Sequence, residues 1–261
     1  MRQIAQAISR LRFAEQARAT QLQVEAERLR NSLLSAISHD LRTPLATIVG
    51  SASAMAEDHG QLQPQQRLEL ATAIAEEAGR MARLINNILD MARLDAGMVE
   101  LHREWHRVEE IIGTVMNQLQ VQCVGRPITI QVPPGMPMLY ADSVLIEQVL
   151  ANLLENALRY TPAGSALAIN VETGNAGTAI SVADQGPGIP KGLEDKLFEK
   201  FYQTRRESAQ SGVGLGLAIC RAIVEVHGGH IYAQNRPEGG AMFTFTIPAH
   251  SVPPLLALEE P

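Results

Sequence analysis

The sequence predicts a hairpin of two long helices followed by an α+β sandwich, and three observations carry this fold class. Before Gly97, apolar residues recur at helical spacing over long stretches. After Gly97, short alternating segments and apolar-faced helices are separated by clusters of Gly and Pro. These strands and helices do not alternate strictly, which favours an α+β arrangement. With 46% hydrophobic and 19% charged residues among 261, the chain can build a core.

The first predicted element is a long helix. Residues 1–34 are rich in Ala, Gln, Glu and Arg and contain no Gly or Pro. Ile4, Ile8 and Leu11 lie near helical spacing, although charged residues interrupt the stripe. We interpret residues 1–30 as a signalling helix with an imperfect coiled-coil seam; a solvated surface helix is the alternative.

Residues 31–97 form the predicted hairpin. The helical pattern continues through Pro44, where a proline is expected to kink the axis, and ends near Met55. The polar turn Glu57–Gly60 precedes a second helix from about Pro64 to Leu94. Because one hairpin buries little apolar surface, we expect two copies to form a dimeric four-helix bundle.

Residues 98–250 form the predicted sandwich, and residues 251–261 are expected to be a flexible tail. Asp142 has the residue type and position of a helix N-cap. The segment 185–213 is too long for a plain connection, which indicates a functional lid. The expected helices are about 108–121, 142–160 and 215–227, and the expected strands are 128–132, 166–173, 178–184, 230–235 and 241–247.

Composition argues against several classes of function. The chain has 22 Lys and Arg against 28 Asp and Glu, a net charge of −6, which argues against nucleic-acid binding. Its two cysteines, Cys123 and Cys220, are far apart, which excludes a disulfide framework or a zinc site. The apolar runs are too short for a spanning helix and no signal peptide is present, so we expect a cytoplasmic protein.

A first group of chemistry-bearing residues begins at His39. Taken alone, a helical histidine is most simply structural or exposed. Here Asp40 can accept a hydrogen bond from Nδ1–H and leave Nε2 as a nucleophile. Thr43 lies one turn along the same helix face, and Arg42 offers a cation for a phosphoryl group. The pattern indicates phosphoryl chemistry on an imidazole.

A second group lies in the predicted helix 142–160. Asn152 and Asn156 are four residues apart and therefore share one helix face. Amide oxygens suit Mg²⁺, which takes a few protein oxygens together with substrate phosphates. Arg159 can reach the phosphates. An ordinary polar stripe is the alternative, although Asn gains little on an exposed helix.

A third group follows the predicted strand 178–184. The glycines Gly186 and Gly188 allow the backbone to approach a ligand closely. The carboxylate of Asp184 can accept a hydrogen bond from an exocyclic amine such as that of adenine. An ordinary Asp-x-Gly turn is the alternative reading of these residues.

A fourth group consists of Gly212, Gly214 and Gly216 at the start of a predicted helix. N–H groups at a helix N-terminus bind phosphates. The segment lacks the Gly-Lys-Ser/Thr ending of a Walker A loop, and no strand immediately precedes it, as a dinucleotide fingerprint requires.

Taken in order, these groups resemble the motifs of sensor histidine kinases of two-component systems. His39–Pro44 resembles the phospho-acceptor box, Asn152–Tyr160 the N box, and Phe198–Phe201 the F box. Asp184–Gly188 and Gly212–Gly216 resemble the two glycine boxes. The resemblance covers residues from about 30 to 248. It implies a dimerisation and phosphotransfer hairpin followed by an ATP-binding α+β sandwich of the Bergerat type.

Three stretches look more specifically like the Kdp-type potassium-responsive sensor kinases. They are Leu89–Arg93, Gly214–His227 and Asn235–Gly240. Those kinases are much longer, with a sensor region and membrane helices that this sequence lacks. The resemblance therefore implies that contact with the membrane runs only through segments absent from this chain.

The resemblance also implies roles for individual residues. His39 would be autophosphorylated from Mg-ATP and would pass the phosphoryl group to an Asp of a response-regulator receiver domain. Asp40 would act as base or orienter, and Thr43 would position water when the partner is dephosphorylated. Asn152 and Asn156 would hold Mg²⁺. The implied ATP-binding residues are Asn152, Asn156, Arg159, Tyr160, Asp184, Gly186, Gly188, Gly212, Gly214 and Gly216.

Three other functions compete with this interpretation. Bergerat ATPases use a water-activating Glu one turn before the metal-binding Asn, but that position here is Asn152, and Glu155 lies on the wrong side of the helix. A pseudokinase would be expected to lack one of the motif residues, all of which are present. Metal sensing by His102/His106 or His227/His230 lacks further ligands, so satisfied or surface histidines are expected.

Overall fold

The computed structural model describes residues 38, 40–58, 62–96, 100–174, 177–202 and 214–250. The predicted signalling helix 1–30, the tail 251–261, His39 and Gly212 lie outside the described residues. The chain divides into two compact units, one from Met1 to Ile85 and one that begins at Asn86 and holds most of the remaining residues. Each unit is described separately below.

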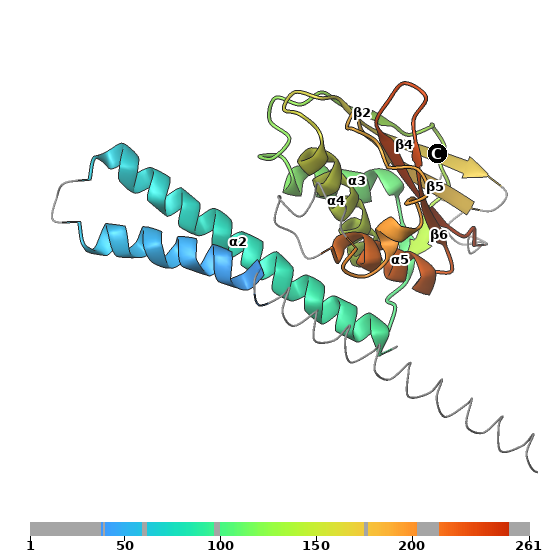
Figure 1. The fold of residues 1–261 in the computed structure, drawn as a ribbon. Coiled ribbons are helices and arrows are strands. Elements are labelled where there is room, and N and C mark those ends of the chain that lie inside the picture. The colour runs from blue at the N-terminus through green and yellow to red at the C-terminus, as the bar shows by residue number, and fades with distance from the viewer. Residues whose placement is uncertain are drawn as a thin grey trace, which may run out of the picture. The chain divides into compact units, whose positions relative to one another are not determined.

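The first unit is a helical hairpin, as predicted. Residues 40–56 form one helix, which continues through the buried Pro44. The second helix, α2 (Pro64–Asp95), begins at the predicted proline and extends beyond Ile85 into the second unit. Figure 1 shows the two helices running antiparallel.

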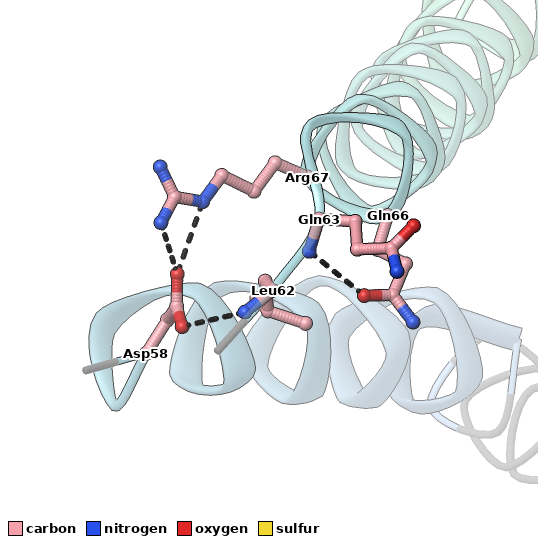
Figure 2. A network of polar contacts seen from close by, with 5 residues as sticks. All are labelled: Asp58, Leu62, Gln63, Gln66 and Arg67. Carbon is pink, nitrogen blue, oxygen red and sulfur yellow. Dashed lines mark hydrogen bonds and ion pairs between the residues drawn. The ribbon is translucent and has the colours of Figure 1, made fainter. Parts of the chain in front are cut away.

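The turn between the two helices is organised by Asp58, whose side chain is only 3% exposed. Asp58 Oδ1 accepts a hydrogen bond from the backbone N–H of Leu62 at 2.9 Å. Its Oδ2 accepts one from Nε of Arg67 at 3.0 Å. The backbone N–H of Gln63 donates to Oε1 of Gln66, which satisfies a donor at the start of α2 (Figure 2).

Several large apolar side chains of the hairpin face solvent. Val49 is 55% exposed and Leu68 is 61% exposed, and Leu45 and Ile85 are similarly open. A hairpin that leaves such side chains uncovered has apolar surface available for a second copy, which is the surface that the predicted four-helix bundle requires.

The second unit is an α+β sandwich built on a five-stranded sheet. The strand order is β2-β4-β5-β7-β6, in which β2 and β4 are parallel and all other neighbours are antiparallel. The sheet strands are β2 (Ile128–Gln131), β4 (Leu167–Gly174), β5 (Gly177–Ala183), β6 (His230–Asn235) and β7 (Ala241–Ile247).

Three helices gather on one side of this sheet (Figure 1). They are α3 (Val108–Gln118), α4 (Ser143–Tyr160) and α5 (Gly216–Val226). The core lies between the helices and the sheet, because alternate residues of β4 such as Ile169 and Val171 are buried there with Leu150 and Leu153 of α4. Asp142 is the N-cap of α4, as predicted, and its Oδ1 accepts a hydrogen bond from Leu145 N–H at 3.3 Å.

Three short elements were not predicted from the sequence. A two-stranded antiparallel sheet joins β1 (Glu104–His106) to β3 (Leu139–Ala141), and a 3-10 helix, η1, spans Lys196–Phe198. Each is only three residues long, which is too short to show a period. In the part of the chain that the structure describes, no helix combines the length and apolar composition needed to cross a membrane.

Candidate nucleotide-binding site

Asp184 follows β5, and both its main chain and its side chain are hydrogen-bonded to backbone groups nearby. Its backbone N–H donates to the carbonyl of Ala241 at 2.9 Å. Its Oδ1 accepts hydrogen bonds from Gly186 N–H at 2.7 Å and from Ala241 N–H at 3.1 Å. No described residue donates a hydrogen bond to Oδ2. One oxygen therefore fixes the orientation of the buried carboxylate, and the other has no hydrogen-bond donor among the described residues.

Each of the two glycines that follow Asp184 is required for a different structural reason. Gly188 has φ +74°, and a Cβ there would lie 2.6 Å from Oδ1 of Asn235. A Cβ on Gly186 would lie 3.0 Å from the carbonyl oxygen of Tyr160. Glycine at these positions lets the loop after β5 pack closely against the end of α4 and against β6.

The helix α4 supplies the amide side chains predicted to hold Mg²⁺. Asn152 and Asn156 are both half-buried on this helix. Nδ2 of Asn152 is buried, and this side chain is a hydrogen-bond partner of the Cys220 thiol, where it opposes the rise in the pKa of that thiol that burial causes. A Cβ on Gly216 would lie 3.9 Å from Oδ1 of Asn152. The carbonyl oxygens of the two amides are hard ligands of the kind that Mg²⁺ takes.

The second glycine segment begins α5. Gly214 has φ +68°, and a Cβ there would lie 2.8 Å from the carbonyl oxygen of Tyr202. Its carbonyl accepts a hydrogen bond from Phe201 N–H at 2.9 Å. Leu215 caps α5 without a side-chain hydrogen bond, and no described residue accepts from the first N–H groups of the helix, which are the kind of donors that bind an anion.

The structure thus brings several predicted residues of the second unit together. Asn152 faces Gly216, and the carbonyl of Tyr160 faces Gly186, so α4 meets both glycine segments. Arg159 is exposed on α4. Asp40 and Thr43 belong to the other unit, where Thr43 is exposed and its carbonyl accepts a hydrogen bond from Thr47 Oγ1 at 3.3 Å.

Sequence reasoning missed three polar side chains around this site. Arg126 donates from Nη2 to the carbonyls of Leu158 and Thr161, at 2.9 and 3.1 Å, and so covers the C-terminal end of α4. Asn235 and Arg236 hydrogen-bond to the loop after β5. The only sequence signal for Asn235 and Arg236 was the stretch Asn235–Gly240, which carried a resemblance but no role, and Arg126 had no sequence signal.

Comparisons with known proteins match both units. Residues 29–97 match the His Kinase A (phospho-acceptor) domain. Residues 141–251 match the family described as histidine kinase-, DNA gyrase B- and HSP90-like ATPase. The chain belongs to the sensor histidine kinases, and the second match indicates ATP binding by the sandwich.

Within that class, the chain is similar to sensor proteins called KdpD. It is 40% identical over 257 residues to KdpD of Escherichia coli, which covers 98% of this chain and 28% of that protein. It is 38% identical over 248 residues to KdpD of Clostridium acetobutylicum, covering 94% of this chain and 28% of that protein. The chain therefore spans less than a third of these relatives.

Solved histidine kinases share the fold. AdeS of Acinetobacter baumannii superposes with a TM-score of 0.64 at 23% identity, covering 82% of this chain and 98% of AdeS. The kinase ThkA, solved in complex with the response regulator TrrA, gives a TM-score of 0.61 at 27% identity. That match covers 85% of this chain and 64% of the ThkA chain.

Proposed function

We propose that this chain transfers the terminal phosphoryl group of ATP to His39 and then to an aspartate of a response regulator. The observation that carries the proposal is the buried carboxylate of Asp184, with Oδ1 fixed by two backbone N–H groups and no hydrogen bond to Oδ2 from any described residue. Because the hydrogen bonds to Oδ1 fix the direction of Oδ2, Oδ2 is suited to accept a hydrogen bond from the exocyclic amine of adenine. The match of residues 141–251 to an ATPase family supports the same ligand.

We assign the phosphate end of the nucleotide to α4 and α5. The amide side chains of Asn152 and Asn156, one helical turn apart on α4, fit a Mg²⁺–phosphate group, because their carbonyl oxygens are hard ligands. Bound Mg²⁺ would neutralise phosphate charge. Gly212, Gly214 and Gly216 would place backbone N–H groups against the phosphates, and Arg159 and Tyr160 would lie at the edge of the nucleotide.

The acceptor end of the reaction is assigned to the hairpin. Asp40 would hold the Nδ1–H tautomer of His39, so that Nε2 attacks the terminal phosphorus and ADP leaves. Thr43 would position water for removal of the phosphoryl group from the regulator. The match of residues 29–97 to a phospho-acceptor domain supports this assignment. Positioning of the two reactants would supply most of the rate enhancement.

The partners follow from the same assignment. We propose a homodimer formed through the exposed apolar residues of the hairpin, and a receiver domain as the phosphoryl acceptor.

The proposed boundaries are a signalling helix at 1–30, a phosphotransfer domain at 31–97, a catalytic domain at 98–250 and a tail at 251–261. Relatives named KdpD support a role in potassium or osmotic signalling for a cytoplasmic core.

The test is incubation of the full chain with γ-labelled ATP and Mg²⁺, in parallel with His39→Gln and with His59→Gln as a matched control. We expect acid-labile, alkali-stable label on the wild type and on the control, and none on His39→Gln. Rapid release of inorganic phosphate without labelled protein would instead support an ATPase. Bound nucleotide with neither label nor release would contradict kinase activity of this chain.

A further inference from the structure

The loop from Asp184 to Ile189 is held at its far end by the last residue of β6. Oδ1 of Asn235 accepts a hydrogen bond from Ile189 N–H at 2.6 Å. Nδ2 of Asn235 donates to the carbonyl of the same residue at 2.7 Å. One amide side chain therefore satisfies both backbone groups of Ile189, which fixes the orientation of that peptide plane.

The near end of the loop is held by the next residue along the chain. Nη1 of Arg236 donates to the carbonyl of Asp184 at 2.9 Å. A charge-assisted hydrogen bond of this kind is stronger than a neutral one. The Arg236 side chain is 27% exposed and also lies 3.7 Å from a carboxylate oxygen of Glu238.

The turn that carries Arg236 is itself packed against Asp184. Its backbone is closed by hydrogen bonds from Arg236 N–H to Gly240 O at 3.0 Å and from Gly239 N–H to Arg236 O at 3.1 Å. Gly240 has φ +86°, and a Cβ there would lie 2.1 Å from the carbonyl oxygen of Asp184. Only glycine allows this approach without a shift of the backbone.

We propose that Asn235 and Arg236 are positioning residues for recognition of the nucleobase. Together they hold the loop at both ends, so that Oδ2 of Asp184 keeps the direction in which it accepts the 6-amino group of adenine. If the loop could move, Asp184 would lose this directional hydrogen bond before the site lost its overall affinity for a nucleotide. The inference rests on the proposed function, in which Asp184 reads adenine.

A purely structural role predicts a different result. If the two side chains only stabilise the turn, their loss weakens the binding of every nucleotide by one common factor. If they orient Asp184, their loss weakens the binding of ATP more than the binding of an analogue that lacks the amine. The informative quantity is therefore the preference for ATP over purine riboside triphosphate, which carries hydrogen in place of the 6-amino group.

The experiment measures dissociation constants of both nucleotides by calorimetry on the full chain. The variants are Arg236→Met, which keeps an apolar stem without donors, and Asn235→Asp, which keeps the acceptor for Ile189 N–H but faces its carbonyl with a carboxylate. Tyr232→Phe and Gln234→Ala are matched controls on the same strand. The ratio of the two dissociation constants, measured on one preparation, does not depend on the fraction of the protein that is folded.

We expect the wild type and both controls to prefer ATP by about tenfold or more, as one hydrogen bond to a charged group provides. Arg236→Met and Asn235→Asp should bring the preference to within about threefold, because the bond is misdirected. An unchanged preference in the variants, with both affinities lowered equally, would overturn the inference and leave the proposed function standing. Equal binding of both nucleotides by the wild type would refute adenine reading by Asp184 itself. If Arg236→Met does not fold, Asn235→Asp decides the matter alone.

Discussion

The backbone N–H of Asp142 donates a hydrogen bond at 3.1 Å to Nε2 of His227, a residue 85 positions further along the chain. Nδ1 of His227 lies 2.7 Å from the carbonyl of Ile223. Because Nε2 accepts, the ring proton must reside on Nδ1 and donate to that carbonyl. The neutral imidazole thus joins the end of α5 to the start of α4, and both of its nitrogens are engaged by the backbone.

This arrangement predicts a pH-dependent stability. Burial lowers the pKa of His227 from 6.5, and the nearby Arg103 lowers it further, whereas Asp142 opposes the shift. The unfolded chain therefore binds more protons between pH 6.5 and the lower folded pKa. The stabilisation from the neutral ring is complete above pH 6.5, is lost as the pH falls through this window, and changes no further below the folded pKa.

The measurement is urea unfolding at a series of pH values, followed by the fluorescence of the single tryptophan, Trp105, on β1. We expect His227→Gln to reduce the slope of stability against pH below 6.5 by at most about 1.4 kcal/mol per pH unit. Identical slopes for wild type and variant would show that His227 does not titrate in this window.

Gly188 and Gly192 form a matched pair for a test of the loop after β5. Both have positive φ, +74° and +80°, so alanine is strained at either position, by about 1–2 kcal/mol. Only at position 188 would the new Cβ also meet Oδ1 of Asn235, at 2.6 Å. We expect Gly188→Ala to lower stability by at least about 1 kcal/mol more than Gly192→Ala.

The same pair should differ in ligand binding. Gly188→Ala is expected to weaken the binding of ATP by about tenfold, because the collision displaces the loop that carries Asp184. Gly192→Ala should bind ATP as the wild type does. Chemical denaturation and calorimetry of the two variants check both statements, and equal losses in the pair would contradict the collision.

Arg126 is predicted to stabilise the C-terminal end of α4. Its guanidinium donates to Thr161 Oγ1 and to the carbonyls of Leu158 and Thr161. Removing it leaves these acceptors at a helix end without their cation. We expect Arg126→Ala to cost about 1–3 kcal/mol in free energy of unfolding and Arg126→Lys to cost less. A loss below about 0.5 kcal/mol for the alanine variant would refute a capping role.

The exposed apolar residues of the hairpin predict the effect of a charge on assembly. A carboxylate at Leu68 would have to be desolvated in a bundle interface. We expect Leu68→Glu to raise the dimer dissociation constant by about a hundredfold. Val144, which is 71% exposed in the second unit, provides the control, since Val144→Glu should dimerise like the wild type. Sedimentation equilibrium measures both; a dimeric Leu68→Glu would contradict the proposed interface.

The elements that the sequence predicted well have local causes. Pro64 and Asp142 mark helix starts through their own chemistry, and the bounds of β6 and β7 match the prediction because turns flank clear strands. The pairing of β1 with β3 could not be predicted, since three-residue strands owe their formation to a partner far away in the sequence. The parallel pairing of β2 with β4 could not be predicted either, because a long connection separates the two strands in the sequence and leaves no local pattern of their pairing.

The candidate site shows the same division. Asp184, the glycines and the two asparagines could be proposed from residue type and spacing, because backbone conformation and ligand chemistry restrict those positions. The roles of Asn235 and Arg236 could not be found, because their hydrogen bonds reach back 46 and 52 residues. The assignments of His39, Asn152 and the other site residues remain predictions.

The position of these supports late in the chain has a consequence for synthesis. Asp184 and its loop leave the ribosome well before Asn235, Arg236 and Ala241, which supply the hydrogen bonds that hold them. Until the turn between β6 and β7 has emerged, a nascent chain carries every motif up to Gly216 but lacks the partners that shape its nucleotide loop. We expect emergence of the turn between β6 and β7, rather than translation of the motifs, to set the moment at which the growing polypeptide becomes able to bind ATP.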